Sequence, residues 1–159
     1  MLKLNYKCSI LFLVIGLSLA FKVNAQVSSQ KLTANWSFQE QDDAKWYPAK
    51  VPGEVHVDLM TNKLIPDPFY RDNEKKLQWI EKENWDYKSA FSVLSDVFQK
   101  QHVELVFDGL DTYADVYLNG KLILQANNMF RQWKIDVKKV LKQKDNKLLI
   151  RFRSAQNTV

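Results

Sequence analysis

Residues 113–125, "YADVYLNGKLILQ", decide the fold class of this chain. Before the turn, small and aliphatic residues occupy every second position, at Ala114, Val116 and Leu118. A period of two is typical of a strand with one buried face. Asn119-Gly120 then gives the strongest hairpin signal in the sequence, because both central positions of a type I′ turn need positive φ. The stretch predicts two antiparallel strands, the second returning over Lys121–Gln125.

Other segments repeat this alternation. Period-two patterns cover residues 32–38, 85–93, 103–107 and 147–152. Between the first two, Pro52-Gly53 indicates a turn, and Val55, Leu59 and Met60 have the spacing of one short helix. Several short strands separated by turns, with little helix, are typical of an antiparallel sandwich. We therefore expect an all-β fold, a jelly-roll β-sandwich with one short helix and no second domain.

The first 25 residues have the composition of a secretory signal peptide. Lys3 and Lys7 form a basic head, an apolar run covers residues 9–21, and "KVNA" provides a small-residue cleavage site. We expect cleavage between Ala25 and Gln26, which divides the chain into a signal peptide, 1–25, and a folded domain, 26–159. The apolar run of about 13 residues is too short for a bilayer, which needs roughly 20. The mature chain is expected to be exported and free of the membrane.

The composition of the mature part excludes other classes of protein. It contains no cysteine, so its core must be stable without disulfides. Without Lys3, Lys7 and Lys22, the 23 basic residues fall to 20 against 18 acidic ones, too balanced for a nucleic-acid partner. His56 and His102 lack nearby partners with metal-ligand spacing. We expect no metal and no cofactor.

No pair of residues suggests a catalytic centre. Glu74 follows an asparagine, as the acid/base does in many retaining glycosidases, but Lys75 and Lys76 would keep it ionised. There is no serine-nucleophile elbow. We expect no catalytic residue in this chain.

Residues 65–74, "IPDPFYRDNE", offer groups that suit a sugar. Aromatic rings stack on the apolar face of a pyranose, and carboxylate and amide groups bind its hydroxyls. Asp72, Asn73 and Trp79 are therefore the candidate substrate-binding residues. The alternative is that the tryptophans of this region fill the core and that Asp72 and Asn73 are ordinary surface residues.

Three longer stretches carry a resemblance to a known family. They are "VPGEVHVDLMTNKLIPDPFYRDNEKKLQWIEKENWDYKSAF" (51–91), "FDGLDTYADVYLNGKLI" (107–123) and "NNMFRQWKIDVKKVLK" (127–142). Together they resemble the amino-terminal signature of β-mannosidases in glycoside hydrolase family 2. The second stretch alone resembles the wider family, which includes β-galactosidases and β-glucuronidases, and the "IPDPFYRDNE" run narrows the resemblance to the mannosidase branch.

The resemblance implies a galactose-binding-like domain that packs against a (β/α)₈ barrel. The barrel would supply both catalytic glutamates and cleave terminal β-linked mannose, with retention, from a β-mannoside oligosaccharide or a glycoprotein glycan. This domain would lend a loop to the sugar pocket. Phe69 and Tyr70 are expected to pin the base of that loop, and Asp72 and Asn73 to face the barrel or its sugar.

The chain stops at Val159, before the final strands that the family's first domain would have. We therefore expect the amino-terminal piece of an exported β-mannosidase, inactive by itself. A stand-alone secreted carbohydrate-binding module and an inert gene fragment are the alternatives. The expected location is periplasmic or extracellular, or lysosomal in a eukaryote.

Overall fold

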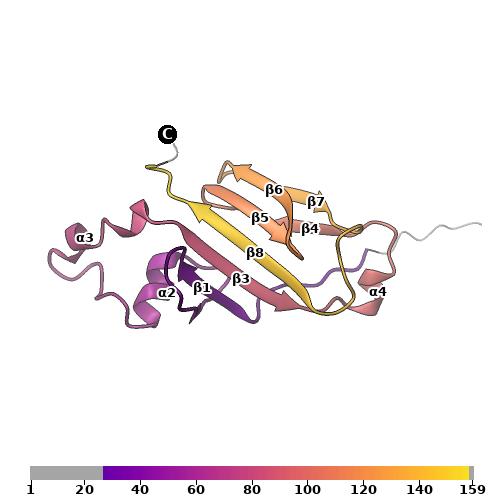
Figure 1. Cartoon of the computed structure of the whole chain (residues 1–159), viewed down its shortest axis with the longest axis horizontal. Coiled ribbons are helices and arrows are strands. Elements are labelled where there is room, and N and C mark those ends of the chain that lie inside the picture. The colour runs from indigo at the N-terminus through magenta and orange to yellow at the C-terminus, as the bar shows by residue number, and fades with distance from the viewer. Residues whose placement is uncertain (1–26, 158–159) are drawn as a thin grey trace, which may run out of the picture.

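A computed structural model describes residues 27–157, so the expected signal peptide lies outside the described residues. The strands form two antiparallel sheets, a six-stranded sheet in the order β2-β1-β3-β8-β5-β6 and a two-stranded sheet β4-β7 (Figure 1). Their bounds are β1 Trp36–Glu40, β2 Tyr47–Pro48, β3 Trp85–Phe91, β4 Glu104–Phe107, β5 Tyr113–Leu118, β6 Lys121–Asn127, β7 Trp133–Asp136 and β8 Asn146–Arg153. The expected all-β sandwich is confirmed.

Among the described residues, the helices are few and short. The helix expected at 55–60 is present as α2 (Val55–Thr61). Three single turns accompany it: α3 (Asn73–Lys76), the 3₁₀ turn η1 (Ile80–Lys82) and α4 (Ser95–Phe98). Within residues 27–157, no helix has the length and apolar character needed to cross a membrane.

The hairpin expected at Asn119-Gly120 joins β5 and β6. Both residues have positive φ, 54° and 81°, as a type I′ turn requires. The alternation predicted for β5 is also present, because Ala114, Val116 and Leu118 are fully buried. The residues between them are only partly buried and point to the other face of the sheet.

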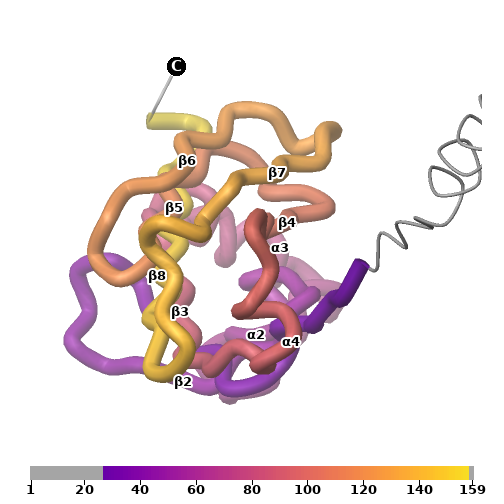
Figure 2. The backbone as a smooth tube through the Cα atoms, turned by 90° about the vertical axis from the view of Figure 1, so that its right-hand side faces the viewer, coloured from indigo at the N-terminus to yellow at the C-terminus, as the bar shows by residue number. Residues whose placement is uncertain are grey.

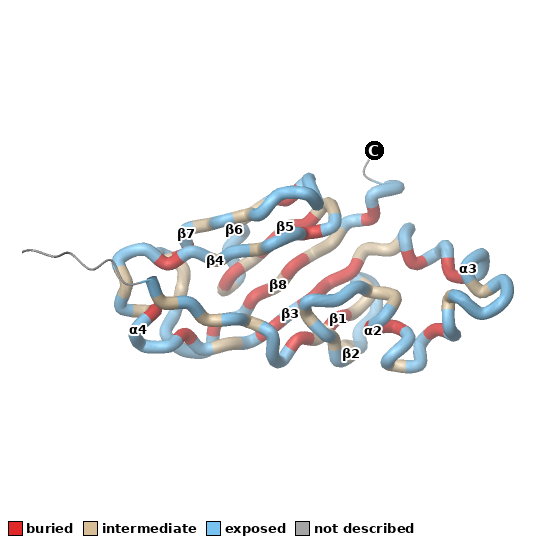
Figure 3. The backbone as a smooth tube through the Cα atoms, turned by 180° about the vertical axis from the view of Figure 1, so that it is seen from behind, coloured by how far each residue is buried: buried red, intermediate tan, exposed pale blue. Residues whose placement is uncertain are grey.

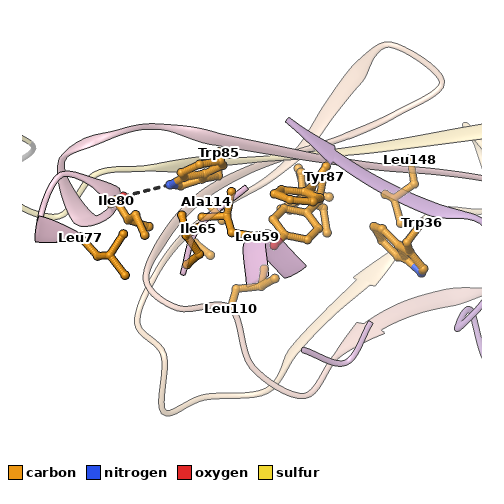
Figure 4. Close-up of a cluster of buried hydrophobic side chains, with 14 residues drawn as sticks. Trp36, Leu59, Ile65, Leu77, Ile80, Trp85, Tyr87, Leu110, Ala114 and Leu148 are labelled. Carbon is orange, nitrogen blue, oxygen red and sulfur yellow. Dashed lines mark hydrogen bonds between the residues drawn. The ribbon is translucent and has the colours of Figure 1, made fainter. Parts of the chain in front are cut away.

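The core lies between the two sheets. In the end-on view, β4 lies across the interior from β8 and β3 (Figure 2), and buried residues line β3 and β8 (Figure 3). Phe38 of β1 is fully buried and stacks on Tyr87 of β3, with 5.6 Å between the ring centroids. Trp85 donates a hydrogen bond from Nε1 to the carbonyl oxygen of Ile80 at 3.0 Å, which fixes η1 against the start of β3 (Figure 4).

A buried carboxylate holds α2 against the sheet. Asp58 accepts hydrogen bonds from the backbone N–H of Lys50, at 2.9 Å, and from the hydroxyl of Tyr87, at 3.0 Å. Burial, followed by the charge of Asp58, raises the pKa of Tyr87 far above its usual range, so this phenol stays a donor. The two bonds connect the turn before α2, the helix and β3.

Two asparagines close the end of the sandwich near α4, which lies away from α2 and α3 (Figure 1). The Oδ1 of Asn146 accepts hydrogen bonds from the amide of Asn119, at 3.0 Å, and from the backbone N–H of Lys142, at 2.8 Å. Its Nδ2 donates to the carbonyl oxygens of Lys142 and Phe91. Asn146 is fully buried, and we call this region the asparagine end.

Candidate functional site

The segment 66–78, which contains α3, projects beyond the end of the six-stranded sheet (Figures 1 and 3). Its two ends are fixed by Ile65 and Leu77, which are buried. The expectation that Phe69 and Tyr70 pin its base is wrong, since these residues are 95% and 57% exposed. The backbone turns on both sides of the two rings. The N–H of Phe69 donates to Oδ1 of Asp67 at 2.9 Å, and Arg71 has a positive φ of 54°.

Asp72 and Asn73 lie at the start of α3. Nδ2 of Asn73 donates to the carbonyl oxygen of Asp67 at 2.8 Å, which closes the loop on itself. Asp72 makes an exposed ion pair with Lys76, 3.2 Å from Oδ1 to Nζ. Exposed pairs of this kind stabilise a protein by less than about 1 kcal/mol. The carboxylate can therefore exchange its partner at little cost.

Trp79 lies apart from these two residues, on the wall of a pocket of about 170 Å³. Four aromatic residues and two carboxylates line this pocket, which we call the aromatic pocket. They are Phe38, Tyr47, Trp79, Trp85, Glu40 and Asp43. Asp72 and Asn73 do not line it. Trp79 is 38% exposed, whereas Trp85 is buried, so the alternative of a core position holds for Trp85 and not for Trp79.

Several acidic side chains gather at the aromatic pocket. Burial, followed by the charges of Glu83, Asp43 and Asp42, raises the pKa of Glu40. In the part of the chain that the structure describes, none of these four carboxylates forms an ion pair. We call the projecting segment, residues 66–78, together with the aromatic pocket, the loop end of the molecule.

Sequence reasoning singled out Trp79 as a candidate for binding a sugar, and it did not place Glu40 or Asp43 beside it. Glu40 ends β1 and Asp43 lies in the turn that follows, about 40 residues before Trp79. Only the pairing of β1 with β3, in which Glu40 faces Trp85, brings them together. Across residues 27–157, no group of three histidine, cysteine or acidic side chains is placed to hold a metal ion.

Comparison with known proteins identifies relatives of this domain. A family model described as "Glycosyl hydrolase 2 galactose-binding domain-like" matches residues 36–159. β-Mannosidase B of Thermothelomyces thermophilus is 42% identical over 127 residues, covering 78% of this chain and 15% of that protein. β-Mannosidase of Rattus norvegicus is 38% identical over 127 residues, covering 80% of this chain and 14% of that protein.

Solved structures agree with these matches. The crystal structure of β-D-mannosidase from Dictyoglomus thermophilum superposes with a TM-score of 0.78 at 44% identity, over 80% of this chain and 16% of that one. The exo-chitosanase CsxA of Amycolatopsis orientalis, 18% identical with a TM-score of 0.68 over 80% of this chain and 17% of its own, shares the fold. The chain spans about 15% of the length of the curated relatives that it matches. It belongs to the galactose-binding-like amino-terminal domains of glycoside hydrolase family 2, and its homologues include β-mannosidases.

Proposed function

We propose that this chain is the amino-terminal, non-catalytic domain of an exported β-mannosidase that hydrolyses terminal β-linked mannose with retention. Relatives named β-mannosidase, at 42% and 44% identity, support the activity, and the roughly 15% share of their length supports a domain role. The observation that carries the proposal is the projecting segment 66–78. An aromatic ring that is 95% exposed, as Phe69 is, favours a segment that contacts something outside the domain.

In this proposal the catalytic glutamates belong to the barrel, and the present chain supplies positioning groups. The carboxylate of Asp72 exchanges Lys76 for a sugar hydroxyl or a donor of the barrel. Asn73 holds the loop closed through Asp67, and its Oδ1, which accepts no hydrogen bond from the described residues, stays available as an acceptor. Trp79 lies apart from these two residues, on the wall of the aromatic pocket, so this proposal gives it no contact with the sugar. Retention requires the two glutamates of the barrel to lie about 5–5.5 Å apart, so that one acts as the nucleophile and the other as the acid/base.

The proposal is tested by placing residues 36–157 in the β-D-mannosidase of Dictyoglomus thermophilum, in place of the segment of that enzyme that matches them. In this chimera, Asp72→Ala should lower kcat/KM on an aryl β-mannoside by roughly 5- to 150-fold, which is the effect of losing about 1–3 kcal/mol of transition-state binding. The melting temperature should stay constant. Asp96→Ala is the matched control, because Asp96 is an exposed aspartate in the first turn of α4, near the asparagine end.

Equal kcat/KM in the Asp72 and Asp96 variants would show that the projecting segment has no part in substrate recognition. A second arm uses the mature chain alone, which should release no nitrophenol from the same substrate. Turnover by that chain, persisting after removal of host glycosidases, would contradict the non-catalytic role. Tight binding of β-mannan by the chain alone would instead favour the stand-alone carbohydrate-binding module.

A further inference from the structure

We propose that the aromatic pocket binds an arginine side chain presented by the adjoining domain of the same enzyme. This inference rests on the proposed function, because it assumes a second domain next to this one. It concerns how the two domains hold together, and the substrate has no part in it. Three properties of the aromatic pocket support the assignment: its size, its charge and the arrangement of its walls.

The size suits one side chain. Sites for small molecules usually enclose roughly 300–1,000 Å³. The aromatic pocket encloses about 170 Å³. Its rings come from β1, from β2, from Trp79 directly before η1, and from the first residue of β3. Trp79 is partly exposed at this site, so an incoming group can reach its ring. A single planar head group fits this space better than an oligosaccharide.

The charge favours a cation. Glu40 and Asp43 line the pocket, and Asp42 and Glu83 act on Glu40 from nearby. In residues 27–157 these carboxylates have no ion-pair partner. The hydroxyls of a neutral sugar would donate hydrogen bonds to these carboxylates, but they would leave the repulsion between the carboxylates unchanged. A cation offsets that repulsion, because it is attracted to each of the carboxylates.

The walls favour arginine over lysine. A guanidinium group stacks its flat face on an aromatic ring and donates two parallel hydrogen bonds to a carboxylate at its edge. The aromatic pocket offers both partners, with the rings of Trp79 and Trp85 at 6.2 Å between centroids and Glu40 beside them. The neighbouring Lys45 already places its ammonium 4.6 Å from the ring of Tyr47, so one ring of this pocket has a cation beside it. Tryptophan, tyrosine and arginine are also the residues that dominate binding energy at interfaces.

The first experiment measures the chemistry of the pocket in the mature chain. N-acetyl-L-arginine amide is added while the indole N–H signals of Trp79 and Trp85 are followed by NMR. We expect a saturable shift of both signals, and no saturable shift with N-acetyl-L-citrulline amide, which has nearly the same shape but no charge. Glu40→Gln should weaken arginine binding by about tenfold, as expected for losing a charged hydrogen bond. Asp43→Asn is a second variant of the same wall.

The control for both variants is Asp96→Asn, which makes the same change in net charge near the asparagine end. Equal weakening by Asp96→Asn would reduce the effect to the overall charge and overturn the proposal. Equal binding of the citrulline compound would show an apolar pocket without cation selectivity. Saturable binding of methyl β-mannoside at the same signals, with higher affinity than arginine, would assign the pocket to sugar.

The second experiment identifies the source of the arginine. In the mature chain alone, Glu40→Gln should raise the melting temperature, because it removes repulsion. In the chimera with the Dictyoglomus enzyme it should lower the melting temperature, because it removes the partner of the docked arginine. A rise in both proteins would overturn the docking role. These outcomes are independent of the kcat/KM of the Asp72 variant, so the failure of this inference and the failure of the proposed function can be distinguished.

Discussion

The two ends of the sandwich differ in how their polar and aromatic groups are buried and paired. At the asparagine end, a fully buried amide is satisfied by the chain itself, through Asn119, Lys142 and Phe91. At the loop end, the ring of Phe69 faces outward, and the carboxylates of the aromatic pocket form no ion pair among the described residues. The first arrangement stabilises this domain. The second reduces its stability and is explained if another domain covers it.

The largest expected effect contrasts two phenylalanines. Phe38→Ala removes a fully buried ring and should lower the free energy of unfolding by about 3–5 kcal/mol. Phe69→Ala removes a ring that is 95% exposed and should change it by less than about 0.5 kcal/mol. Denaturant unfolding of both variants checks the difference. A loss of several kcal/mol in the Phe69 variant would mean that this ring packs within the domain in solution.

A medium effect is expected from the asparagines. Asn146→Ala removes four part-buried hydrogen bonds, which join Asn146 to Asn119, Lys142 and Phe91, and should destabilise the fold by about 2–4 kcal/mol. Asn128→Ala is the matched change near the other end of the strands, where Oδ1 of an exposed Asn128 accepts from the N–H of Phe130. This variant should lose no more than about 1 kcal/mol. Similar losses in both variants would contradict the distinction between the ends.

The smallest effect concerns the pH dependence of stability. The pKa of Glu40 is raised in the folded state, so the folded protein holds this proton more tightly than the unfolded chain. Stability from this group is therefore present at low pH and is lost as the pH rises from the ordinary value of 4.5 through the raised pKa. Glu40→Gln should stabilise the mature chain by a few tenths of a kcal/mol at pH 7, typical of a surface charge change.

Near pH 4, where Glu40 is largely protonated, the gain from Glu40→Gln should disappear. Thermal unfolding at the two pH values, with Asp96→Asn as the reference, measures this difference. An equal gain in stability at both pH values would come from packing, and it would mean that Glu40 is not destabilised by the neighbouring carboxylates.

Sequence alone predicted the strands that obey a simple period. Ala114, Val116 and Leu118 are buried as the alternation indicated, and Asn119-Gly120 forms the expected turn. Asn146 was not predicted, because a single asparagine in a lysine-rich run has the appearance of a solvated residue, and its partners lie up to 55 residues away. Pattern cannot reveal a polar group whose burial depends on tertiary pairing.

The projecting segment shows a second limit of sequence reasoning. Aromatic residues directly after two prolines suggested a packed loop base, but the anchors are Ile65 and Leu77. Hydrophobicity predicts that Phe69 will be covered, and it does not say by which domain. The aromatic pocket was missed for a related reason, since Glu40 and Trp79 meet only through strand pairing.

The position of β8 bears on the timing of folding during synthesis. β8 is the last described strand to leave the ribosome, yet it pairs with β3 on one side and β5 on the other. Until Asn146–Arg153 has emerged, the larger sheet can exist only as two separate parts, β2-β1-β3 and β5-β6, each with an open edge. Such edges are templates for aggregation, and pairing across long sequence separations is slow. The nascent chain therefore depends on β8 to join the two parts of the sheet, and a ribosome stalled before Asn146 would display two half-sheets with unpaired edges.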